Sequence, residues 1–549
     1  MPRAAPDRPA PDASDATEGA EEYDYVIVGG GTAGCVLANR LSADPACRVL
    51  LLEAGGSDRY HWVQIPVGYL YCIGNPRVDW MMKTAPEPGL GGRSLVYPRG
   101  KVLGGCSSIN GMIYMRGQAA DYDGWRQMGN TGWGWDDVLP YFRRSEAHHA
   151  GETPLHGADG EWPVSTQRVG WDILRAVQAG AAEFGWHPTD DFNAGSNEGT
   201  GFFEVNQRRG LRWNTTRAFL RPAMRRRNLR VLTGALTERL LLDGRRVTGV
   251  AYRHRGRARL ALARAEVLLA AGAINSPKLL ELSGIGQPDR LAALGIAPRH
   301  DLPGVGENLQ DHLQIRTVFK VSGTTTLNEL SHSMTARLRM AAQFALTRSG
   351  PLSMAPSQFG MFTRSDPALA TPDLEYHVQP LSTDRLGDPL HRFPAITVSV
   401  CNLRPESVGH CHITRNDADP QPEIVLNYLS APRDRQVTVT AIRQARRLMT
   451  ARALARHEPR EFLPGPKVQS EAELVEAAGR IATTIFHPVG TCKMGQDRSA
   501  VVAPDLRVHG LGGLRVVDAS IMPRIVSGNT ASPVIMIAEK AADMILGRD

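Results

Sequence analysis

The stretch Tyr25-Val26-Ile27-Val28-Gly29-Gly30-Gly31-Thr32-Ala33-Gly34 decides the fold of the N-terminal part of the chain. Its four apolar residues are typical of a short buried β-strand, and they run directly into the pattern GxGxxG. A helix-like segment follows and ends near Pro45, and a second apolar strand, 49–52, leads to Glu53. A strand, a glycine-rich turn, a helix and a second strand in this order predict a βαβ unit that binds a dinucleotide.

Each glycine of this pattern has its own physical task. Gly29 permits a tight turn, Gly31 lets the backbone approach a pyrophosphate, and Gly34 allows the helix to pack closely on the strand. Glu53 stands 19 residues after Gly34, where a carboxylate can accept hydrogen bonds from ribose hydroxyls. This unit does not separate FAD from NAD, so other segments have to decide the cofactor.

The composition indicates a large globular protein. The 549 residues suggest about two to four domains, and 42% hydrophobic with 22% charged residues excludes a mainly disordered chain. The net charge is +7, but basic runs such as Arg225-Arg226-Arg227 have no interleaved aromatic residues. We therefore assign these arginines to solvated faces and expect no nucleic-acid partner.

The N-terminus and the cysteines bear on location. Residues 1–22 are rich in Pro, Ala, Asp and Glu without an apolar segment, so we expect a disordered extension and no signal peptide. The seven cysteines are scattered and lack a CxxC pair, which argues against a disulfide framework and a metal site. We expect a reducing, cytoplasmic compartment. No run of 18 apolar residues occurs, so we expect no transmembrane segment, while peripheral membrane contact and the oligomeric state stay open.

Strand and helix signals continue after a loop-rich region at about 130–215. Apolar residues 240–242 lead through Asp243-Gly244 into 247–250, which predicts a β-hairpin, and 266–270 reads as a further buried strand. Between about 320 and 475, strands such as 396–400 alternate with long Arg-rich helices such as 432–450. This alternation indicates a second domain inserted into the first.

Four further segments carry a family resemblance. They are Arg99-Gly100-Lys101-Val102-Leu103-Gly104-Gly105-Cys106-Ser107-Ser108-Ile109-Asn110-Gly111; Gly272-Ala273-Ile274-Asn275-Ser276-Pro277; Pro303-Gly304-Val305-Gly306-Glu307-Asn308-Leu309-Gln310-Asp311-His312; and His487-Pro488-Val489-Gly490-Thr491 with Val517-Asp518-Ala519-Ser520 and Ser527-Gly528-Asn529-Thr530. Together with the N-terminal fingerprint they resemble the glucose–methanol–choline (GMC) family of FAD-dependent oxidoreductases, most closely its choline-dehydrogenase-like branch. The likeness extends from about residue 23 to the C-terminus.

The resemblance implies an α/β fold, with a Rossmann-like FAD-binding domain and an inserted α+β substrate domain whose antiparallel sheet roofs the flavin. We expect the FAD-binding domain to comprise residues 23–130, 215–320 and 480–549. The substrate domain would then comprise residues 131–214 and 321–479.

The family motifs also imply the cofactor-binding residues. Asn110 and its neighbours would lie along the isoalloxazine edge, Thr237 by the adenine, and Ala519 by the pyrophosphate. The full set is Gly29, Gly31, Thr32, Ala33, Gly34, Glu53, Val102, Gly105, Asn110, Gly111, Met112, Ile113, Thr237, Asp518, Ala519 and Thr530. Some members tether FAD covalently through a histidine at the position of Ile109, so we predict noncovalent FAD here.

A helix at the C-terminus is predicted on physical grounds. Ser532 can cap it with Pro533 at its first position, and Val534, Ala538 and Ala541 share one apolar face. If its N-terminus points at the flavin, the helix dipole favours the negative charge of the reduced ring.

Alcohol oxidation needs a proton acceptor beside the hydride acceptor. A neutral imidazole, with an ordinary pKa near 6.5, is matched to take the hydroxyl proton as hydride leaves for flavin N5. A second polar group then orients the oxygen and stabilises its developing charge. The family motifs place these groups at His487 and Asn529.

Other residues bear on the substrate. His377 matches a substrate-site histidine of choline-oxidising relatives and competes with a structural interpretation, while His312 is taken as structural. Those relatives carry a carboxylate where this chain has Gln314, and a Tyr can stand at Phe486. Losing a buried anion removes the reason to prefer a cation, so we expect a neutral primary or secondary alcohol. The triplet His410-Cys411-His412 is not expected to bind a metal.

Several alternatives remain at this level. Choline dehydrogenation is one, and a lyase on the same fold, of the hydroxynitrile lyase or photodecarboxylase type, is another. Binding of flavin without catalysis is disfavoured because His487 and Asn529 are both present. The electron acceptor is a quinone, another carrier or O2, with a dehydrogenase favoured over an oxidase.

Overall fold

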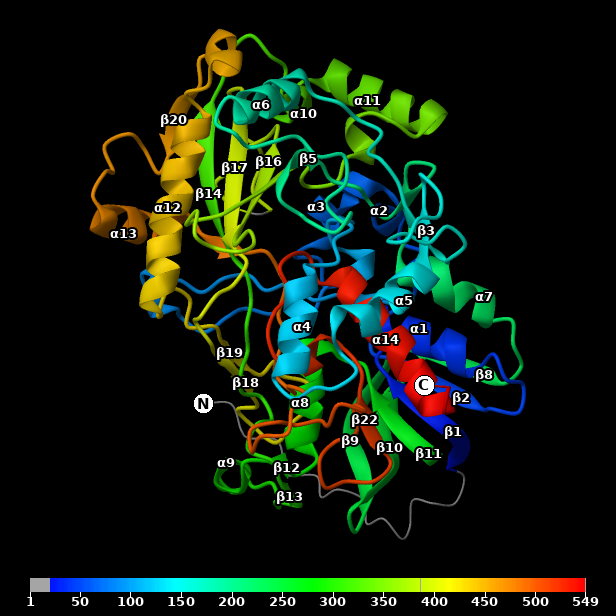
Figure 1. The fold of residues 1–549 in the computed structure, drawn as a ribbon. Coiled ribbons are helices and arrows are strands. Elements are labelled where there is room, and N and C mark those ends of the chain that lie inside the picture. Colours follow the sequence, from blue (N-terminus) through cyan, green and yellow to red (C-terminus); the bar gives the residue numbers. More distant parts are fainter. Residues whose placement is uncertain (1–19, 386, 549) are drawn as a thin grey trace, which may run out of the picture.

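The computed structural model describes residues 20–385 and 387–548 (Figure 1). The extension expected at 1–22 lies mostly outside the described residues. Its last two residues were assigned wrongly, because Glu21 and Glu22 already belong to β1 (Glu21–Val28). They pair with Ala261 and Leu262 of the long strand β11 (Arg257–Leu269), which gives β1 a partner beyond its apolar half.

The first sheet has the Rossmann-like arrangement predicted from the glycine motif. Its order is β8-β2-β1-β11-β10-β9, and β22 pairs with the end of β11; the remaining strands are β2 (Val49–Glu53), β8 (Leu229–Thr233), β9 (Ala235–Asp243), β10 (Arg246–His254) and β22 (Leu514–Val516). β1, β2, β8, β11 and β22 are parallel, and β9 and β10 form the predicted hairpin. Every residue of β2 is buried, as expected for a strand covered on both faces.

Helices cover this sheet and bring distant segments together. Helix α1 (Thr32–Leu41) packs on the C-terminal helix α14 (Ala531–Leu546), which also contacts α5 (Trp135–Ser145). Figure 1 shows α1, in blue, beside α14, in red. Helix α8 (Gly272–Leu282) follows β11 directly. The N- and C-terminal motifs are therefore neighbours in space although about 500 residues separate them, as a single Rossmann-like unit requires.

The second sheet is antiparallel, as the resemblance implied. Its order is β20-β14-β17-β16-β15-β5, and β21 pairs with β14; the strands are β5 (Gly199–Phe202), β14 (Leu313–Lys320), β15 (Phe359–Thr363), β16 (Leu374–Gln379), β17 (Ala395–Asn402), β20 (Arg460–Leu463) and β21 (Thr483–Thr484). Helix α12 (Pro432–Leu448) packs on β14 and β17, and α13 (Glu471–Ile481) packs on α12 and β14. In Figure 1 this sheet lies above the first one.

Two strands of this sheet differ from the predicted domain ranges. β14 and β21 fall inside the ranges 215–320 and 480–549 that we expected for the FAD-binding domain, yet they pair with each other in the antiparallel sheet. The motif ending at His312 runs straight into β14 without a glycine, proline or polar break. The sequence therefore holds no signal for the change of sheet, which long-range pairing with β17 determines.

The remaining helices and strands are short or lie outside the two large sheets. They are α2 (His61–Gln64), α3 (Tyr69–Cys72), α4 (Ala119–Gln127), α6 (Asp172–Ala182), α7 (Arg221–Ala223), α9 (Pro288–Ala293), α10 (Leu327–His332), α11 (Met334–Thr347), β3 (Glu146–His148), β4 (Trp162–Val164), β6 (Gln207–Arg208), β7 (Leu211–Arg212), β12 (Ile285–Gly286), β13 (His300–Asp301), β18 (His410–His412) and β19 (Glu423–Val425). Within the described ranges, none of the helices is long and apolar enough to cross a bilayer.

Candidate active site

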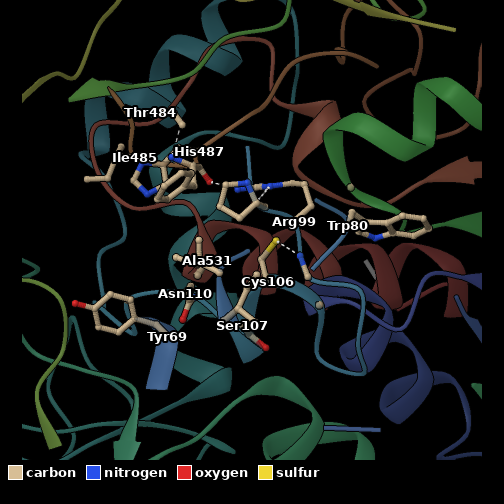
Figure 2. Close-up of a pocket in the computed structure, with 18 of the residues that line it drawn as sticks. Tyr69, Trp80, Arg99, Cys106, Ser107, Asn110, Thr484, Ile485, His487 and Ala531 are labelled. Carbon is tan, nitrogen blue, oxygen red and sulfur yellow. Dashed lines mark hydrogen bonds between the residues drawn. The ribbon is translucent and has the colours of Figure 1, made fainter. Parts of the chain in front are cut away.

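A cavity of about 830 Å³ is lined by residues of both sheets (Figure 2). All of the predicted site residues line it except Gly34 and Val102. Gly34 packs within the glycine turn, and the fully buried Val102 belongs to a small apolar cluster with Val63 and Ile109. The volume lies in the range of cofactor and ligand pockets.

The glycine turn has the geometry that the sequence predicted. Gly29 has φ +103°, in the region that favours glycine. A Cβ on Gly34 would lie 1.9 Å from the carbonyl oxygen of Gly29, so close packing excludes a side chain there. A Cβ on Gly31 would meet no protein atom closer than 3.7 Å, although Gly31 lines the cavity. The space beside Gly31 is therefore left for a ligand.

Glu53 ends β2 at the wall of the cavity, with 5% of its surface exposed. Its Oε2 accepts a hydrogen bond of 2.8 Å from the Gly30 N–H, and its Oε1 accepts one of 2.7 Å from Gly55. Burial raises the pKa of Glu53 to about 7, against the lowering effect of these two bonds and of Lys101. Each carboxylate oxygen can accept a further bond, as ribose hydroxyls require.

Buried polar atoms without partners mark the cavity wall. Thr237 Oγ1, Asn275 Oδ1 and Asn529 Oδ1 make no hydrogen bond within the described protein, and all three residues line the cavity. Buried polar atoms in native proteins are normally hydrogen-bonded. These three therefore fit a polar, extended ligand such as FAD.

Helix α14 begins at the cavity, where Thr530, Ala531 and Val534 line it. The prediction that Ser532 caps this helix is wrong. Thr530 is the N-cap, Ser532 lies inside the first turn, and its buried Oγ has no hydrogen-bond partner. The residue before Pro533 was taken as the boundary, but proline is tolerated anywhere in a first turn because the N–H groups there need no helical partner. Thr530 and Ala531, at the start of the helix, still line the cavity.

Asp518 joins three chain segments beneath the cavity. Its Oδ2 accepts hydrogen bonds from the Gly272 N–H at 2.8 Å and the Ser276 hydroxyl at 2.6 Å, and its Oδ1 accepts the Ser520 N–H at 2.8 Å. Burial raises the pKa of Asp518, and these bonds oppose the rise. The carboxylate thereby fixes the start of α8 against the segment after β22.

His487 belongs to a chain of hydrogen bonds. Asn529 Nδ2 lies 3.1 Å from His487 Nε2, His487 Nδ1 lies 3.1 Å from His312 Nδ1, and His312 Nε2 lies 3.2 Å from the Leu403 carbonyl oxygen. One set of neutral tautomers satisfies the chain: His312 donates to Leu403, His487 donates through Nδ1, and Asn529 donates to Nε2. In this arrangement His487 Nε2 is a hydrogen-bond acceptor at the cavity.

The electrostatics keep both imidazoles neutral. Burial lowers the pKa of His487 well below its ordinary value, and the neighbouring His312, His377 and Arg99 lower it further. Burial likewise lowers the pKa of His312. His312, expected to be structural, is thus in direct contact with the predicted proton acceptor.

Asp311 holds His487 in position, although no local sequence pattern distinguishes this residue. Its Oδ1 accepts the His487 N–H at 2.7 Å, and its Oδ2 accepts the hydroxyls of Tyr97, Tyr428 and Thr484 at 3.0, 2.6 and 2.5 Å. The donors come from segments far apart in the chain. Only their convergence in the fold shows that this buried carboxylate holds the histidine backbone.

The backbone before His487 is constrained. Phe486 has φ +72°, which is uncommon for a non-glycine residue. Its N–H donates to Thr484 Oγ1 at 2.7 Å, and its carbonyl accepts from Arg99 at 2.7 Å. Figure 2 shows Arg99, Thr484 and His487 around the cavity. This constrained turn directs the His487 ring towards the cavity and not towards the antiparallel sheet.

The antiparallel sheet supplies the opposite wall. Gln314 of β14 and His377 of β16 line the cavity. Glu375 lies on the same face of β16 as His377, fully buried and outside the lining, and its Oε1 is 3.2 Å from His377 Nε2 without the alignment of a hydrogen bond. Gln314 therefore faces the cavity, whereas the carboxylate on this face of the sheet does not line it.

Two histidine clusters lie away from the cavity. In the predicted non-metal triplet, His412 lies between Glu281 and Glu307, at 2.7 and 3.1 Å. In the second cluster, His148 and His149 each approach Glu204 Oε1, at 3.0 and 2.8 Å. The Ala150 N–H donates to His148 Nδ1, so the neutral ring carries its proton on Nε2 and donates to Glu204. In both clusters histidine rings lie within hydrogen-bonding distance of carboxylates, and the absence of a metal stays a prediction.

Comparison with known proteins agrees with this geometry. The family model described as GMC oxidoreductase matches residues 23–314, and its C-terminal counterpart matches residues 405–538. The chain is 40% identical to an alcohol dehydrogenase (acceptor) of Pseudomonas putida over 529 residues, covering 95% of this chain and 96% of that protein. It is 40% identical to mitochondrial choline dehydrogenase of Homo sapiens over 545 residues, covering 98% and 92%.

A solved structure extends the comparison to three dimensions. Pyridoxine 4-oxidase from Mesorbium loti matches with a TM-score of 0.86 at 32% identity, covering 95% of this chain and 98% of that chain. The motifs, both sheets and the cavity thus agree with the matches along the chain. The protein belongs to the GMC oxidoreductase family and is an FAD-dependent oxidoreductase.

Proposed function

We propose that the protein oxidises a primary or secondary alcohol that carries no cationic group, with His487 as the proton acceptor. The observation that carries this proposal is the hydrogen-bonded chain that leaves His487 Nε2 unprotonated at the cavity. Bound FAD supplies the hydride acceptor for such a reaction. The residues lining the cavity then have to place the hydroxyl group and remove its proton.

The substrate hydroxyl would take the place of the contact between His487 and Asn529. His487 Nε2 would accept the hydroxyl proton, and Asn529 Nδ2 would donate to the oxygen as charge develops on it. The pKa of His487 is lowered, so the ring is neutral and able to accept a proton throughout the physiological range. Asp311 holds the backbone N–H of His487, and His312 contacts Nδ1 of its ring, so both residues keep His487 in position.

We propose further that FAD is held noncovalently. Ile109 is aliphatic and 4% exposed, so it offers no nucleophile at the position where some members carry the linking histidine. Acid precipitation tests this directly: a colourless pellet and a yellow supernatant are expected. A pellet that retains the flavin colour would contradict noncovalent binding.

Choline oxidation is the second candidate, because choline dehydrogenases are among the relatives at 40% identity. The lining argues against it: Gln314 is neutral, and Arg316 adds a positive charge to the same strand face. A buried cation disfavours a quaternary ammonium group. An anaerobic panel that compares choline with 3,3-dimethylbutanol, its uncharged isostere, separates the two. Faster flavin reduction by choline would establish the second candidate.

We propose that electrons leave for a carrier at a membrane surface. Helix α11 exposes Met334, Leu338 and Leu346, at 65%, 65% and 85%, while its Met340 is buried and lines the cavity. Arg337 and Arg339 are exposed on the same helix, and the chain has a net charge of +7. An apolar stripe with arginines suits an anionic lipid surface. The seven unpaired cysteines support a reducing, cytoplasmic compartment.

Vesicle sedimentation tests this membrane contact. We expect the protein to sediment with phosphatidylglycerol vesicles and not with pure phosphatidylcholine, and Leu338→Glu to abolish the association. Met224, which is 47% exposed on another part of the surface, provides the control Met224→Glu. Equal loss in both variants, or no association of the wild type, would remove the membrane from the proposal.

A further inference from the structure

Strand β14 places an unpaired cation on the cavity wall. Arg316 lines the cavity and is 9% exposed, on the same face of the strand as Gln314. Among the described residues, none forms a hydrogen bond or an ion pair with its guanidinium, and Tyr69 is the neighbouring group that favours its charge. Burial lowers the pKa of Arg316, which expresses the cost of a charge without a partner.

The register of the sheet extends this polar wall. Arg316 pairs with Ser399 of β17, and Ser399 pairs with His377 of β16, so the three side chains form one row across three strands. Ser399 Oγ and both ring nitrogens of His377 are buried without hydrogen-bond partners, although His377 Nε2 lies 3.2 Å from the Glu375 carboxylate. Arg316 and His377 line the cavity, so the two ends of this row are available to a polar ligand.

The separation between Arg316 and His487 sets the length of a substrate that reaches both residues. β21 ends three residues before His487 and pairs with β14 at Leu313 and Gln314. Arg316 lies two residues further along β14, which is about 7 Å in an extended strand. A group bound at Arg316 is therefore separated from the reacting hydroxyl by a spacer of several atoms.

We infer that Arg316 binds a carboxylate on the alcohol substrate, so that the enzyme acts on hydroxy acids with the hydroxyl and carboxylate at opposite ends. A guanidinium matches a carboxylate with two parallel hydrogen bonds, and a buried cation needs such a counter-charge. Ser399 and His377 continue the polar row beside it. This inference rests on the proposed function. It narrows the substrate from alcohols without a cation to alcohols with an anion, and so departs from the neutral alcohol expected from the sequence.

Matched substrates test the inference. Anaerobic flavin reduction is measured with a series of terminal hydroxyalkanoates from four to ten carbons and with their methyl esters, at pH 7. We expect the acid to exceed its ester about tenfold or more in the ratio of reduction rate to dissociation constant, at an optimal chain length. Equal values for acid and ester at every length would overturn the inference.

Variants locate the effect. Arg316→Gln is expected to bring the ratio of acid to ester close to one, and Arg316→Lys to leave an intermediate ratio because lysine lacks the planar fork. Lys320→Gln, which removes an exposed cation at the end of the same strand, is expected to keep the wild-type ratio. An unchanged ratio in Arg316→Gln would refute the assignment.

A binding measurement on the wild-type enzyme tests the inference without any substitution. Unreactive alkanoates of the same length should inhibit the wild-type enzyme competitively, about tenfold more strongly than the corresponding amides. Equal inhibition overturns the role of Arg316. Reduction by esters without a preference for acids overturns this inference alone, whereas an absence of flavin reduction by any alcohol overturns the proposed function itself.

Discussion

His487 and His312 meet through their Nδ1 atoms at 3.1 Å, with their rings nearly perpendicular at 84°. Only one of two facing Nδ1 atoms can carry a proton, so this contact couples the tautomers of the two rings. The Nε2–H of His312 donates to the Leu403 carbonyl oxygen, so His312 Nδ1 carries no proton in the neutral ring. The proton between the two Nδ1 atoms is therefore carried by His487. His487 Nε2 is thereby left as an acceptor at the cavity.

The first prediction concerns His312 as a positioning residue. His312→Ala removes the acceptor for His487 Nδ1 and should slow anaerobic flavin reduction about 10- to 100-fold. His312→Asn offers its amide oxygen near the same place and should recover much of the rate. The pH profile of reduction should change in the alanine variant, since the His487 tautomer is no longer fixed. Equal rates in the two variants would show that His312 acts only through packing.

The second prediction separates cofactor binding from folding. Gly31→Ala places a methyl group in the cavity without a protein clash, so the variant should fold normally and bind FAD at least about tenfold more weakly. Gly34→Ala places its methyl 1.9 Å from the Gly29 carbonyl and should fail to fold or lose much of its stability. FAD titration of the refolded apoprotein and thermal unfolding measure the two effects. Unaltered FAD affinity in Gly31→Ala would contradict the ligand space assigned to Gly31.

The third prediction concerns Asp311. Asp311→Asn replaces a carboxylate, which accepts several buried hydrogen bonds, with an amide that has one accepting oxygen and one donating NH2 group. The change should lower the free energy of unfolding by about 3 kcal/mol. It should also slow flavin reduction, because one amide oxygen cannot accept both the His487 N–H and the three hydroxyls. Asp434 is a matched control, since it accepts the Glu406 and Ser407 N–H groups outside the cavity. Asp434→Asn should lower stability without slowing reduction; an equal loss of rate would refute the positioning role.

The fourth prediction is a pH dependence. The folded pKa of His487 lies well below 6.5, so the unfolded chain binds a proton at this residue near pH 6.5 while the native protein does not. The contribution of His487 to stability is present above pH 6.5 and is lost as the pH falls towards its folded pKa. Melting temperatures at pH 5 and pH 7 should therefore differ less in His487→Gln than in the wild type. For the same reason, the acid limb of the reduction rate should lie below pH 6.5.

Much of the FAD-binding half could be predicted from local sequence patterns. Gly29 and Gly34 carry constraints of turn geometry and close packing that any sequence with this pattern shares. The hairpin of β9 and β10 followed from an Asp-Gly turn between apolar runs. Identification of His487 needed a family motif, because a histidine before a proline has no local signature of catalysis.

The wall opposite the cofactor could not be predicted in the same way. Arg316 lines the cavity because β14 pairs with β17 in a particular register, and a shift of one residue would turn Arg316 away. Asp311 is held by hydrogen bonds from the hydroxyls of Tyr97 and Tyr428, which lie far from it in the chain. Register and long-range convergence are set by the whole fold, and a local pattern contains neither.

Anaerobic stopped-flow reduction with a carbon-deuterated alcohol tests whether hydride passes to the flavin while His487 takes the hydroxyl proton. We expect the flavin of the wild type to bleach with a primary deuterium isotope effect. His487→Ala should retain FAD and bleach about 10²- to 10⁴-fold more slowly, the usual worth of a positioned base. The exposed His187 provides the control His187→Ala, which should match the wild type. Product formation with no change in flavin absorbance would indicate a lyase, and unchanged reduction in His487→Ala would show that His487 is not the proton acceptor.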